Sequence, residues 1–352
     1  MQLPALLGTE LPLIQAPMAG VQGSALAIAV CQAGGLGSLP TATFSLQQLG
    51  EELAAIRAAT DRPFNLNFFC HTPPVPDAAR EAAWQQTLAP YYAEFGIEVA
   101  PTASGAARQP FSAEAAALLE VHRPAVVSFH FGLPSVELLQ RVRATGAKIL
   151  ASATTIEEAL WLEQRGVDAV IAQGLEAGGH RGHFLSHDLS IQDGVFALVG
   201  KCVRVLRCPT IAAGGIADAQ GVRATMSLGA AGVQVGTAYL LCPEATTSAV
   251  HRAALKAAQA DPAHTTQLTH LFTGRPARGL TNRVMRELGA LNAAAPAFPL
   301  AGAAMAPLRA KAEVQGSGDF SPLWSGQNPQ GCKEIPAAEL TRELAAGFKA
   351  AA

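Results

Sequence analysis

The sequence has few charged residues and no excess of either sign. Asp, Glu, Lys and Arg make up 15% of its 352 residues, against roughly 25% in an average globular protein. Lys plus Arg number 25 and Asp plus Glu 27, so the formal net charge is −2. Nucleic acids and anionic membrane surfaces are recognised by basic fields. We therefore expect neither nucleic acid nor membrane as a partner.

Dense cysteine patterns and long apolar runs are also missing. No CxxC occurs, and dispersed thiols are typical of a reducing compartment. No apolar run approaches the ~20 residues that cross a bilayer, and the first residues lack the basic region and cleavage site of a signal peptide. We expect a soluble, cytoplasmic protein with buried thiols. The six cysteines are Cys31, Cys70, Cys202, Cys208, Cys242 and Cys332.

What the sequence does contain is a repeated strand and helix pattern. Short apolar or β-branched runs are followed by a Gly or polar break and then by a helical stretch, which is typical of βα units. Eight such strands predict an α/β fold of the (β/α)₈ TIM-barrel type, which takes about 250 residues. The predicted strands span residues 11–20, 35–40, 63–70, 125–132, 147–155, 168–173, 208–214 and 232–239.

The domain organisation follows from the barrel. We assign residues 1–241 to the barrel, 242–335 to a small C-terminal cap over its mouth and 336–352 to a final helix, predicted to end at Ala350. A Pro-rich stretch with a helix (77–94) and a loop (178–193) both follow the carboxyl end of a strand. Active sites of such barrels lie on that face. These insertions are therefore expected to form a lid or a pocket.

Two neighbouring strands end in loops suited to phosphate binding. The seventh is followed by Gly214 and Gly215, and the eighth ends in Gln234, Val235, Gly236 and Thr237. Glycine lets backbone N–H groups approach a phosphate, and a hydroxyl can add a donor. Simple turn glycines are the alternative interpretation. The AGGLGS motif (33–38) is rejected as a dinucleotide site, because it follows a helix and opens a strand.

The segment after the sixth strand, QGLEAGGHRGH (173–183), is the most informative stretch. A flavin requires an amide for its pyrimidine edge, backbone that can approach its ring, and an acid or base near the reacting carbon. Gln173, Gly178 with Gly179, and His180 supply these groups in that order. A metal site formed by His180, His183, His187 and Asp188 is an alternative, but its spacing matches no metal motif.

Residues at the other strand ends limit the types of reaction that the protein can catalyse. His130 ends the fourth strand, where it either faces the cavity or is a satisfied structural histidine. Asn67, in an apolar strand, must bond either a ligand or a neighbouring loop. No lysine, no pair of carboxylates and no GxSxG motif occupies the strand ends. A bound cofactor is therefore the expected source of reactivity.

Several of these segments, taken together, resemble class I nitronate monooxygenase. The resemblance implies FMN as the cofactor, with its ring over Ala16, Pro17 and Met18, its pyrimidine edge near Asn67 and Gln173, and its phosphate on Gly215 and residues 234–237. It also implies His180 as the catalytic base, with His130 and Met18 in the substrate pocket. The matching segments are residues 14–20 (IQAPMAG), 65–67, 129–132, 172–182 (AQGLEAGGHRG), 212–218 (AAGGIAD) and 274–279 (GRPARG).

By the same resemblance, an alkyl nitronate, or a nitroalkane deprotonated by His180, would react with O₂ through the flavin to give a carbonyl compound and nitrite. The protein would be a monomer or homodimer. Residues 297–305 depart from the family, because they carry neither hydroxyl nor cation, and so favour apolar alkyl nitronates. The alternatives are an FMN-dependent NAD(P)H:quinone or enoyl-thioester reductase on the same barrel, and a non-catalytic flavin- or phosphate-binding barrel.

Overall fold

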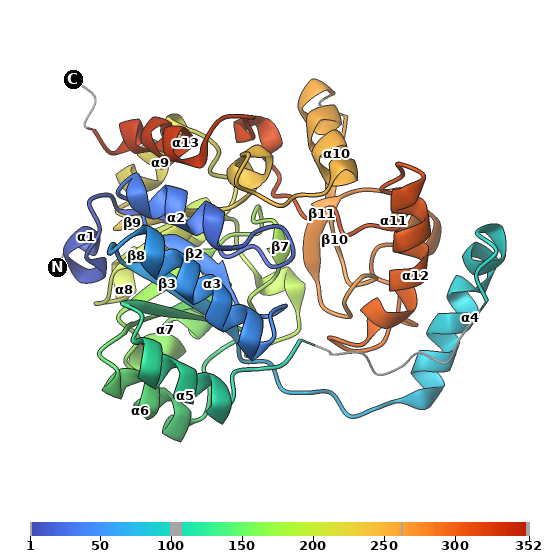
Figure 1. Cartoon of the computed structure of the whole chain (residues 1–352), viewed down its shortest axis with the longest axis horizontal. Coiled ribbons are helices and arrows are strands. Elements are labelled where there is room, and N and C mark those ends of the chain that lie inside the picture. The colour runs from blue at the N-terminus through green and yellow to red at the C-terminus, as the bar shows by residue number, and fades with distance from the viewer. Residues whose placement is uncertain (1, 99–107, 262, 350–352) are drawn as a thin grey trace.

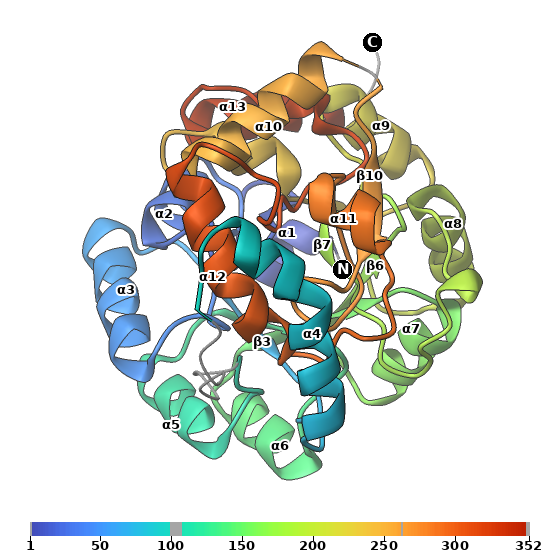
Figure 2. The same ribbon diagram turned by 90° about the vertical axis from the view of Figure 1, so that its right-hand side faces the viewer.

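The computed structural model describes residues 2–98, 108–261 and 263–349. Figure 1 shows two parts side by side: a barrel that carries both termini, and a smaller cap beside the barrel mouth. In Figure 2, which looks through the cap, the barrel helices form a ring around the central strands. The predicted α/β barrel is confirmed.

Eight parallel strands form the barrel. Their order around the sheet is β1-β9-β8-β6-β5-β4-β3-β2. A parallel bridge between Ile14 and Leu36 joins the two edge strands, which brings the barrel close to closure. The strands are β1 (Leu13–Gln15), β2 (Gly37–Pro40), β3 (Phe64–Phe69), β4 (Val126–His130), β5 (Lys148–Ala153), β6 (Ala169–Gln173), β8 (Thr210–Ala213) and β9 (Gly232–Val235).

Side chains along each strand point alternately inward and outward, so the barrel has one hydrophobic core inside it and another between the strands and the helices. In β4, Val127 and Phe129 belong to the large cluster between the strands and the helices, while Val126 belongs to the apolar cluster inside the barrel. Successive strand residues point to opposite faces, so Val126, Ser128 and His130 share the inner face. Along β4, the side chains inside the barrel are therefore first apolar (Val126), then a hydroxyl (Ser128) and finally an imidazole (His130). His130 is the one at the barrel mouth.

Helices cover the outside of the barrel, and several begin at a side-chain cap. Ser135 Oγ accepts the Leu138 N–H at the start of α6, and Ser45 forms a full capping box with Gln48 in α3, which satisfies backbone donors left free in the first turn. The barrel helices are α1 (Leu3–Leu7), α2 (Ser24–Gln32), α3 (Leu46–Ala59), α5 (Ala113–His122), α6 (Val136–Ala144), α7 (Ile156–Gln164), α8 (Val195–Val205) and α9 (Ala219–Ser227).

The chain returns to the barrel after the cap. Helix α13 (Ala337–Ala345) packs Leu340 and Leu344 into the main core, and Figure 1 places it beside α2 and α9. The final turn tightens to a 3₁₀-helix over Ala346–Phe348. The predicted end of the helix at Ala350 lies outside the described residues. Short 3₁₀ turns also occur at η1 (Leu189–Ile191), η2 (Thr237–Leu241) and η3 (Pro329–Gly331).

The cap is built around a small antiparallel sheet. Strands β10 (Thr266–Thr269) and β11 (Ala277–Leu280) pair with each other, and β7 (Gly179–His180) adds to β11. Because β7 belongs to the loop after β6, a barrel loop completes the sheet of the cap. The cap helices are α10 (Ala249–Ala260), α11 (Arg283–Leu288) and α12 (Ala301–Val314).

Helix α4 (Ala78–Glu94), the insertion after β3, packs on the cap. Trp84 and Tyr92 are buried in the hydrophobic cluster of the cap. The Trp84 Nε1–H donates to the Ala301 carbonyl at 3.2 Å, and the Tyr92 hydroxyl donates to the Ala304 carbonyl at 2.6 Å. Figure 2 shows α4 lying across α12. The cap that we propose for residues 242–335 therefore also includes a helix from the first third of the chain.

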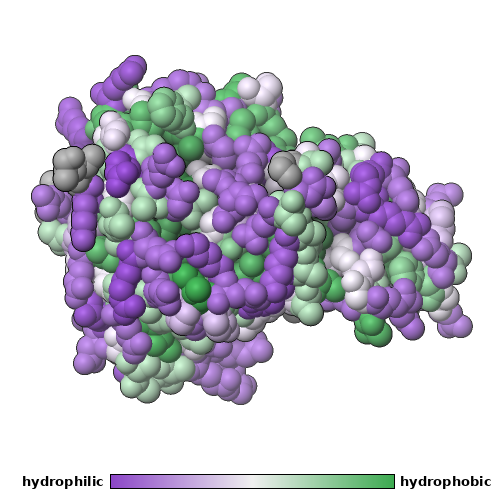
Figure 3. Space-filling view, turned by 90° about the horizontal axis from the view of Figure 1, so that it is seen from above, coloured by the Kyte–Doolittle hydropathy of each residue, from purple (hydrophilic) through white to green (hydrophobic). Residues whose placement is uncertain are grey.

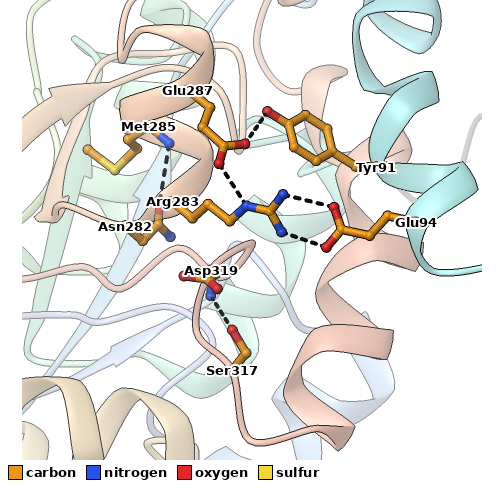
Figure 4. Close-up of polar contacts among 8 residues, drawn as sticks. All are labelled: Tyr91, Glu94, Asn282, Arg283, Met285, Glu287, Ser317 and Asp319. Carbon is orange, nitrogen blue, oxygen red and sulfur yellow. Dashed lines mark hydrogen bonds and ion pairs between the residues drawn. The ribbon is translucent and has the colours of Figure 1, made fainter.

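A polar network ties α4 to α11 at the periphery of the cap (Figure 4). The Arg283 guanidinium donates to both carboxylate oxygens of Glu94, at 2.6 and 2.8 Å, and to Glu287 at 2.8 Å. The Tyr91 hydroxyl donates to Glu287 at 2.8 Å. Since these carboxylates are solvent-exposed, water screens the ion pairs and they add little stability.

The outer surface mixes polar and apolar residues. On the face seen in Figure 3, hydrophobic residues are scattered among hydrophilic ones. The large exposed apolar side chains are spread over several elements, and three of them, Phe196, Val203 and Val205, lie on α8. Among the described residues, no helix has the length and apolar character that crossing a membrane requires. All six cysteines are free thiols.

Candidate active site

A cavity lies where the barrel mouth meets the cap. It contains about 1320 Å³ of space free of protein atoms, including its opening to solvent. Every residue that the sequence assigned to the cofactor or substrate lies on its wall. These residues are Ala16, Pro17, Met18, Asn67, His130, Gln173, Gly178, Gly179, His180, Gly214, Gly215, Gln234, Val235, Gly236 and Thr237.

Buried amides hold the floor of the cavity in place. The Gln15 Nε2 donates to Gln22 Oε1 at 2.7 Å, and the Met18 N–H donates to the same oxygen at 2.9 Å. The Gln22 Nε2 in turn donates to the Ser38 carbonyl at 2.6 Å. These bonds fix residues 16–18 against β2, so the backbone and small side chains of this loop form a firm surface that a planar ring could contact.

The loops after β8 and β9 form a cradle of backbone donors. Gly214 and Gly215 have φ of 121° and 70°, a region that side-chain-bearing residues rarely adopt. The N–H groups of Gly215, Gly236 and Thr237 donate to no acceptor within the described part of the chain. A Cβ on Gly236 would lie 3.2 Å from the Ala16 Cβ. Free N–H groups and close backbone approach are the properties of a phosphate site.

The cap segment 325–328 closes this cradle from outside. The Gly326 N–H donates to Thr237 Oγ1 at 2.9 Å, and the Asn328 side chain donates to the Gly215 carbonyl at 3.3 Å. The Gln234 Oε1 is buried and has no hydrogen-bond partner among the described residues. A buried orphan acceptor favours a ligand that brings a donor. Donors, orphan acceptor and glycine surface all fit a flavin nucleotide.

The amides of Gln173 and Asn67 serve the protein as well as the cavity. The Gln173 Nε2 donates to the His180 carbonyl at 2.9 Å, and its Oε1 accepts the Gly182 N–H at 2.8 Å. The Asn67 Nδ2 donates to Ser128 Oγ at 3.0 Å. Both side chains line the cavity, but these bonds position strand β4 and the His180 loop. Their contact with the flavin stays a prediction.

Arg181 anchors the loop that carries His180. Its guanidinium is fully buried and donates to the Gly174 carbonyl at 2.6 Å, the Gln173 carbonyl at 2.9 Å and Gln192 Oε1 at 2.8 Å. The pairing of His180 with Ala277 in the cap sheet holds the loop from the other side. Two rigid elements therefore fix the imidazole at the barrel–cap junction.

His180 faces an aromatic enclosure. Its ring centroid lies 6.1 Å from that of Phe69, 6.0 Å from Phe131, 5.4 Å from Phe298 and 5.7 Å from Trp324. Burial, followed by the charge of Arg108, holds the His180 pKa well below its ordinary value. At neutral pH the imidazole is therefore uncharged, which is the form that can accept a proton.

Thr273 determines which ring nitrogen of His180 is free. Its Oγ1 lies 3.0 Å from His180 Nε2 and 3.3 Å from the Arg275 carbonyl. When the hydroxyl donates to this carbonyl, it accepts the Nε2–H of His180. Nδ1 then remains as the nitrogen that can take a proton. Thr273 is thus a positioning residue for the candidate base.

His130 both faces the cavity and has a structural role, the two interpretations that the sequence left open. Its ring lines the cavity, while Nδ1 lies 3.0 Å from Ser152 Oγ and Nε2 lies 3.2 Å from the His180 carbonyl. Burial, followed by the charge of Arg275, lowers its pKa to about 3. His130 is therefore a neutral, well-bonded wall of the cavity that also supports the His180 backbone.

The alternative metal site has no geometric support. The rings of His183 and His187 are 5.7 Å apart, but His183 is buried and is not part of the cavity wall. Within residues 2–98, 108–261 and 263–349, no group of three or more potential ligands could hold a metal ion. The four residues of that hypothesis thus do not form one centre.

Several cavity residues were not found from the sequence. Trp324, His251 and Arg108 line the wall, and Phe298 joins the enclosure around His180. They come from segments without a strand pattern, so only the fold brings them together. Thr273 was not found from the sequence either. The one signal for it was its place directly before the GRPARG segment (274–279).

Comparisons with known proteins identify the family of this chain. A family model described as nitronate monooxygenase matches residues 2–347. A nitronate monooxygenase of Pseudomonas aeruginosa is 43% identical over 342 residues, 96% of each chain. One of Paraburkholderia phytofirmans is 41% identical over 343 residues, 96% of this chain and 92% of the relative. The solved structure of a nitroalkane oxidase from Streptomyces ansochromogenes is 38% identical, with a TM-score of 0.87, and covers 98% of this chain and 97% of its own.

Proposed function

This chain belongs to the nitronate monooxygenase family, and from that premise we propose that it oxidises alkyl nitronates with O₂ to a carbonyl compound and nitrite. It is an oxidoreductase, and its family implies a flavin cofactor. The observation that carries the proposal is the position of His180. A neutral imidazole lies in the same cavity as a cradle of free backbone donors.

We propose FMN as the flavin. Gly215, Gly236 and Thr237 would hold its phosphate, residues 16–18 would support its ring, and the orphan Gln234 Oε1 would accept one of its donors. The segment 325–328, which covers the cradle from outside, favours a terminal monophosphate over a continuing dinucleotide. When bound, the flavin supplies the electron acceptor that the side chains lack.

His180 acts on the substrate in one of two ways. With a neutral nitroalkane, Nδ1 takes the α-proton. With a preformed nitronate, the imidazole orients the anion by hydrogen bonding. The enclosure of Phe69, Phe131, Phe298 and Trp324 excludes water from the reacting carbon, and low polarity strengthens each polar contact inside it.

The test is turnover by the purified, flavin-loaded protein. We expect O₂ uptake and nitrite formation that depend on an added alkyl nitronate, with little oxidation of NADPH. Rapid anaerobic reduction of the flavin by NADPH, without nitrite from any nitronate, would instead support a reductase. Cytoplasmic location and a monomeric or homodimeric state remain predictions from the sequence.

A further inference from the structure

A second uncharged imidazole opens onto the cavity from the side of the cap. His251 lies on α10, is 4% exposed and belongs to the cavity wall. Its Nε2 lies 3.1 Å from the Trp324 carbonyl. Because a carbonyl only accepts hydrogen bonds, Nε2 carries the hydrogen. Burial is the main cause that lowers the His251 pKa to about 4, so at neutral pH the ring is uncharged and Nδ1 has a free lone pair.

The Nδ1 atom of His251 has no partner in the protein. Among the described residues, the side chain forms one hydrogen bond, and it does so through Nε2. Nδ1 is not one of the fully enclosed polar atoms that lack a partner, so it keeps access to open space. Since His251 is almost wholly buried and lines the cavity, that space is the cavity. An acceptor in this position favours a ligand that brings a donor.

The position of His251 is fixed from two sides. Arg252, the next residue of α10, donates to three backbone carbonyls between residues 241 and 245, at 2.8, 2.8 and 3.0 Å. These bonds tie the helix to the segment that follows β9. On the other side, Trp324 is held by a bridge to Gly279 in the cap sheet. The free nitrogen is therefore presented to the cavity by two anchored elements.

The wall around this nitrogen is apolar. Met18, Val21 and Leu240 line the cavity, and they belong to or pack against the hydrophobic cluster that contains Leu255, one turn further along α10. His251 thus supplies one acceptor in a corner that is otherwise formed by aliphatic and thioether side chains. A ligand that fits this corner has an apolar chain with a single donor.

The charges near His251 show which kind of donor fits. Arg309 and Arg252 lower its pKa through their charge, whereas Glu313 alone raises it through its own. Two cations against one carboxylate disfavour an ammonium group. A carboxylate does not fit either, because a lone pair offers it no hydrogen. A neutral hydroxyl is the donor that this environment accepts.

The flavin does not account for the free nitrogen. Its pyrimidine N–H belongs to the edge that we expect near Asn67 and Gln173, and the orphan Gln234 Oε1 is available to a hydroxyl of its ribityl chain. The dimethylbenzene ring of a flavin carries no donor. The Nδ1 atom of His251 is therefore left for the substrate.

The candidate base and His251 lie on either side of one residue. The His180 ring centroid lies 5.7 Å from that of Trp324, while His251 bonds to the carbonyl of the same tryptophan. A substrate whose reacting carbon lies at His180 can therefore extend its chain along Trp324 toward His251.

We propose that His251 is a specificity residue that accepts a hydrogen bond from a hydroxyl group on the alkyl chain of the substrate. The enzyme then takes hydroxyalkyl nitronates as well as plain alkyl nitronates. This inference rests on the proposed function and narrows its substrate class. It agrees with the apolar preference expected from residues 297–305, because a hydroxyl adds no charge.

The experiment compares substrates in which a methyl group replaces the hydroxyl. Steady-state kcat/KM is measured for the nitronates of 3-nitro-1-propanol and 1-nitrobutane, and of 4-nitro-1-butanol and 1-nitropentane. His251→Phe keeps a ring but removes both nitrogens. For at least one chain length, it should lower the ratio of the hydroxyl to the methyl substrate about 5- to 30-fold, the range of one hydrogen bond to a buried acceptor. Unchanged ratios at both lengths would overturn the inference.

Two further variants separate the free nitrogen from the bond to Trp324. His251→Gln places its amide near Nε2 and keeps a donor for the Trp324 carbonyl, so the ratio should stay low. His251→Asn places its amide near Nδ1 and should restore part of the ratio. These two variants also decide the matter if His251→Phe does not fold. The opposite order would show that the bond to Trp324 sets the preference, and would contradict the inference.

The control removes an imidazole of the cap that does not line the cavity. The His270 Nε2 lies 2.6 Å from the Asn292 carbonyl, so His270→Phe also leaves a carbonyl without its donor. The ratio of hydroxyl to methyl substrate should not change in this variant. A fall as large as that in His251→Phe would mean that a disturbed cap, rather than Nδ1 of His251, changes the ratio.

Flavin binding tests the other possible partner of Nδ1. By equilibrium dialysis, His251→Phe should bind FMN within about 3-fold of the wild type. A larger loss would assign Nδ1 to a ribityl hydroxyl of the cofactor and overturn the inference.

A binding measurement separates this inference from the proposed function. In 4-hydroxybutyrate and pentanoate, a carboxylate that cannot be oxidised takes the place of the nitronate group. Calorimetry with the flavin-loaded protein gives both Kd values, and the preference of the wild type for 4-hydroxybutyrate should exceed that of His251→Phe at least about 5-fold. If the wild type turns over no nitronate but shows this difference, the function fails and the hydroxyl site stands. Equal preferences in both proteins contradict the hydroxyl site whatever the turnover.

Discussion

The two walls of the cavity are made in different ways. The backbone wall, formed by residues 16–18, 214–215 and 236–237, presents N–H groups and glycines from neighbouring strand ends. The side-chain wall, formed by Phe69, His130, His180, His251 and Trp324, joins side chains from the barrel and the cap. A backbone wall suits a ligand group that never varies, such as a phosphate. A side-chain wall can be altered residue by residue, and so can set chemistry and substrate choice.

The sharpest test of this division is the loss of the candidate base. His180→Ala should slow oxidation of a neutral nitroalkane about 100- to 10,000-fold, because only this substrate needs its proton removed. Oxidation of the preformed nitronate should fall less than about 10-fold. Stopped-flow rates with both substrates check the difference. Equal losses would mean that His180 only binds the anion.

The backbone wall can be damaged without touching the base. In Gly236→Val, a side chain would press on Ala16 and Met18, and overpacking of this kind costs enough to weaken flavin binding about 10- to 100-fold. Equilibrium dialysis against FMN measures the effect. Gly200→Val, at a helical position with no atom within 4 Å of the added Cβ, should bind FMN normally. If Gly236→Val binds FMN as tightly as the wild type, these loops do not hold the phosphate.

Acid should act on four buried histidines, two of which, His130 and His251, belong to the side-chain wall. Burial is the main cause that lowers the pKa of His71 and His251 to about 4, and of His130 and His183 to about 3. Between those values and 6.5, the unfolded chain binds more protons than the folded one, so stability falls as pH falls. Each histidine contributes up to about a tenfold change in the unfolding constant per pH unit.

Urea unfolding between pH 7.5 and 5 checks this expectation. His251→Gln, which keeps a donor for the Trp324 carbonyl but does not titrate, should show a shallower decline. A stability that is flat across this range would contradict the burial of neutral imidazoles.

A smaller effect is expected from the residue that orients the base. Thr273→Val removes the partner of His180 Nε2, and the loss of one neutral hydrogen bond should lower kcat with a nitroalkane about 2- to 10-fold. The acid limb of the rate profile should also move to lower pH, because the imidazolium loses an acceptor. Thr265→Val, in an exposed threonine pair of the cap, serves as the control. An unchanged pH profile would reduce Thr273 to a structural role.

The smallest effect should come from the network between α4 and α11. Arg283→Met removes the exposed ion pairs seen in Figure 4. We expect a small fall in Tm that disappears in 1 M salt, since surface pairs are screened, and unchanged kcat/KM. A large loss of activity would show that the attachment of α4 controls the side-chain wall.

The difference between the backbone wall and the side-chain wall also explains which parts of the structure the sequence could predict. The sequence predicts the eight strands, the loops after β8 and β9, and the place of His180 in the loop after β6. These features follow from hydrophobic periodicity, glycine placement and chain order. Each of these signals lies within a few residues of the feature that it predicts. The backbone wall is therefore readable from the sequence.

The side-chain wall needed the fold. Trp324 and the enclosure residue Phe298 lie in stretches without periodicity, and nothing in the sequence marks Arg108 as a residue of the cavity. The attachment of α4 to the cap depends on contacts such as Trp84 with Ala301, more than 200 residues apart. Local patterns carry no information about partners at that separation.

The central claim, that this cavity holds one FMN with its phosphate on the backbone wall, is tested most directly by the chromophore of the purified protein. Its visible spectrum should show a bound flavin, and denaturation should release FMN at one molecule per chain, by mass and phosphate analysis. A protein that stays colourless after incubation with FMN, or that releases a dinucleotide, would contradict the account.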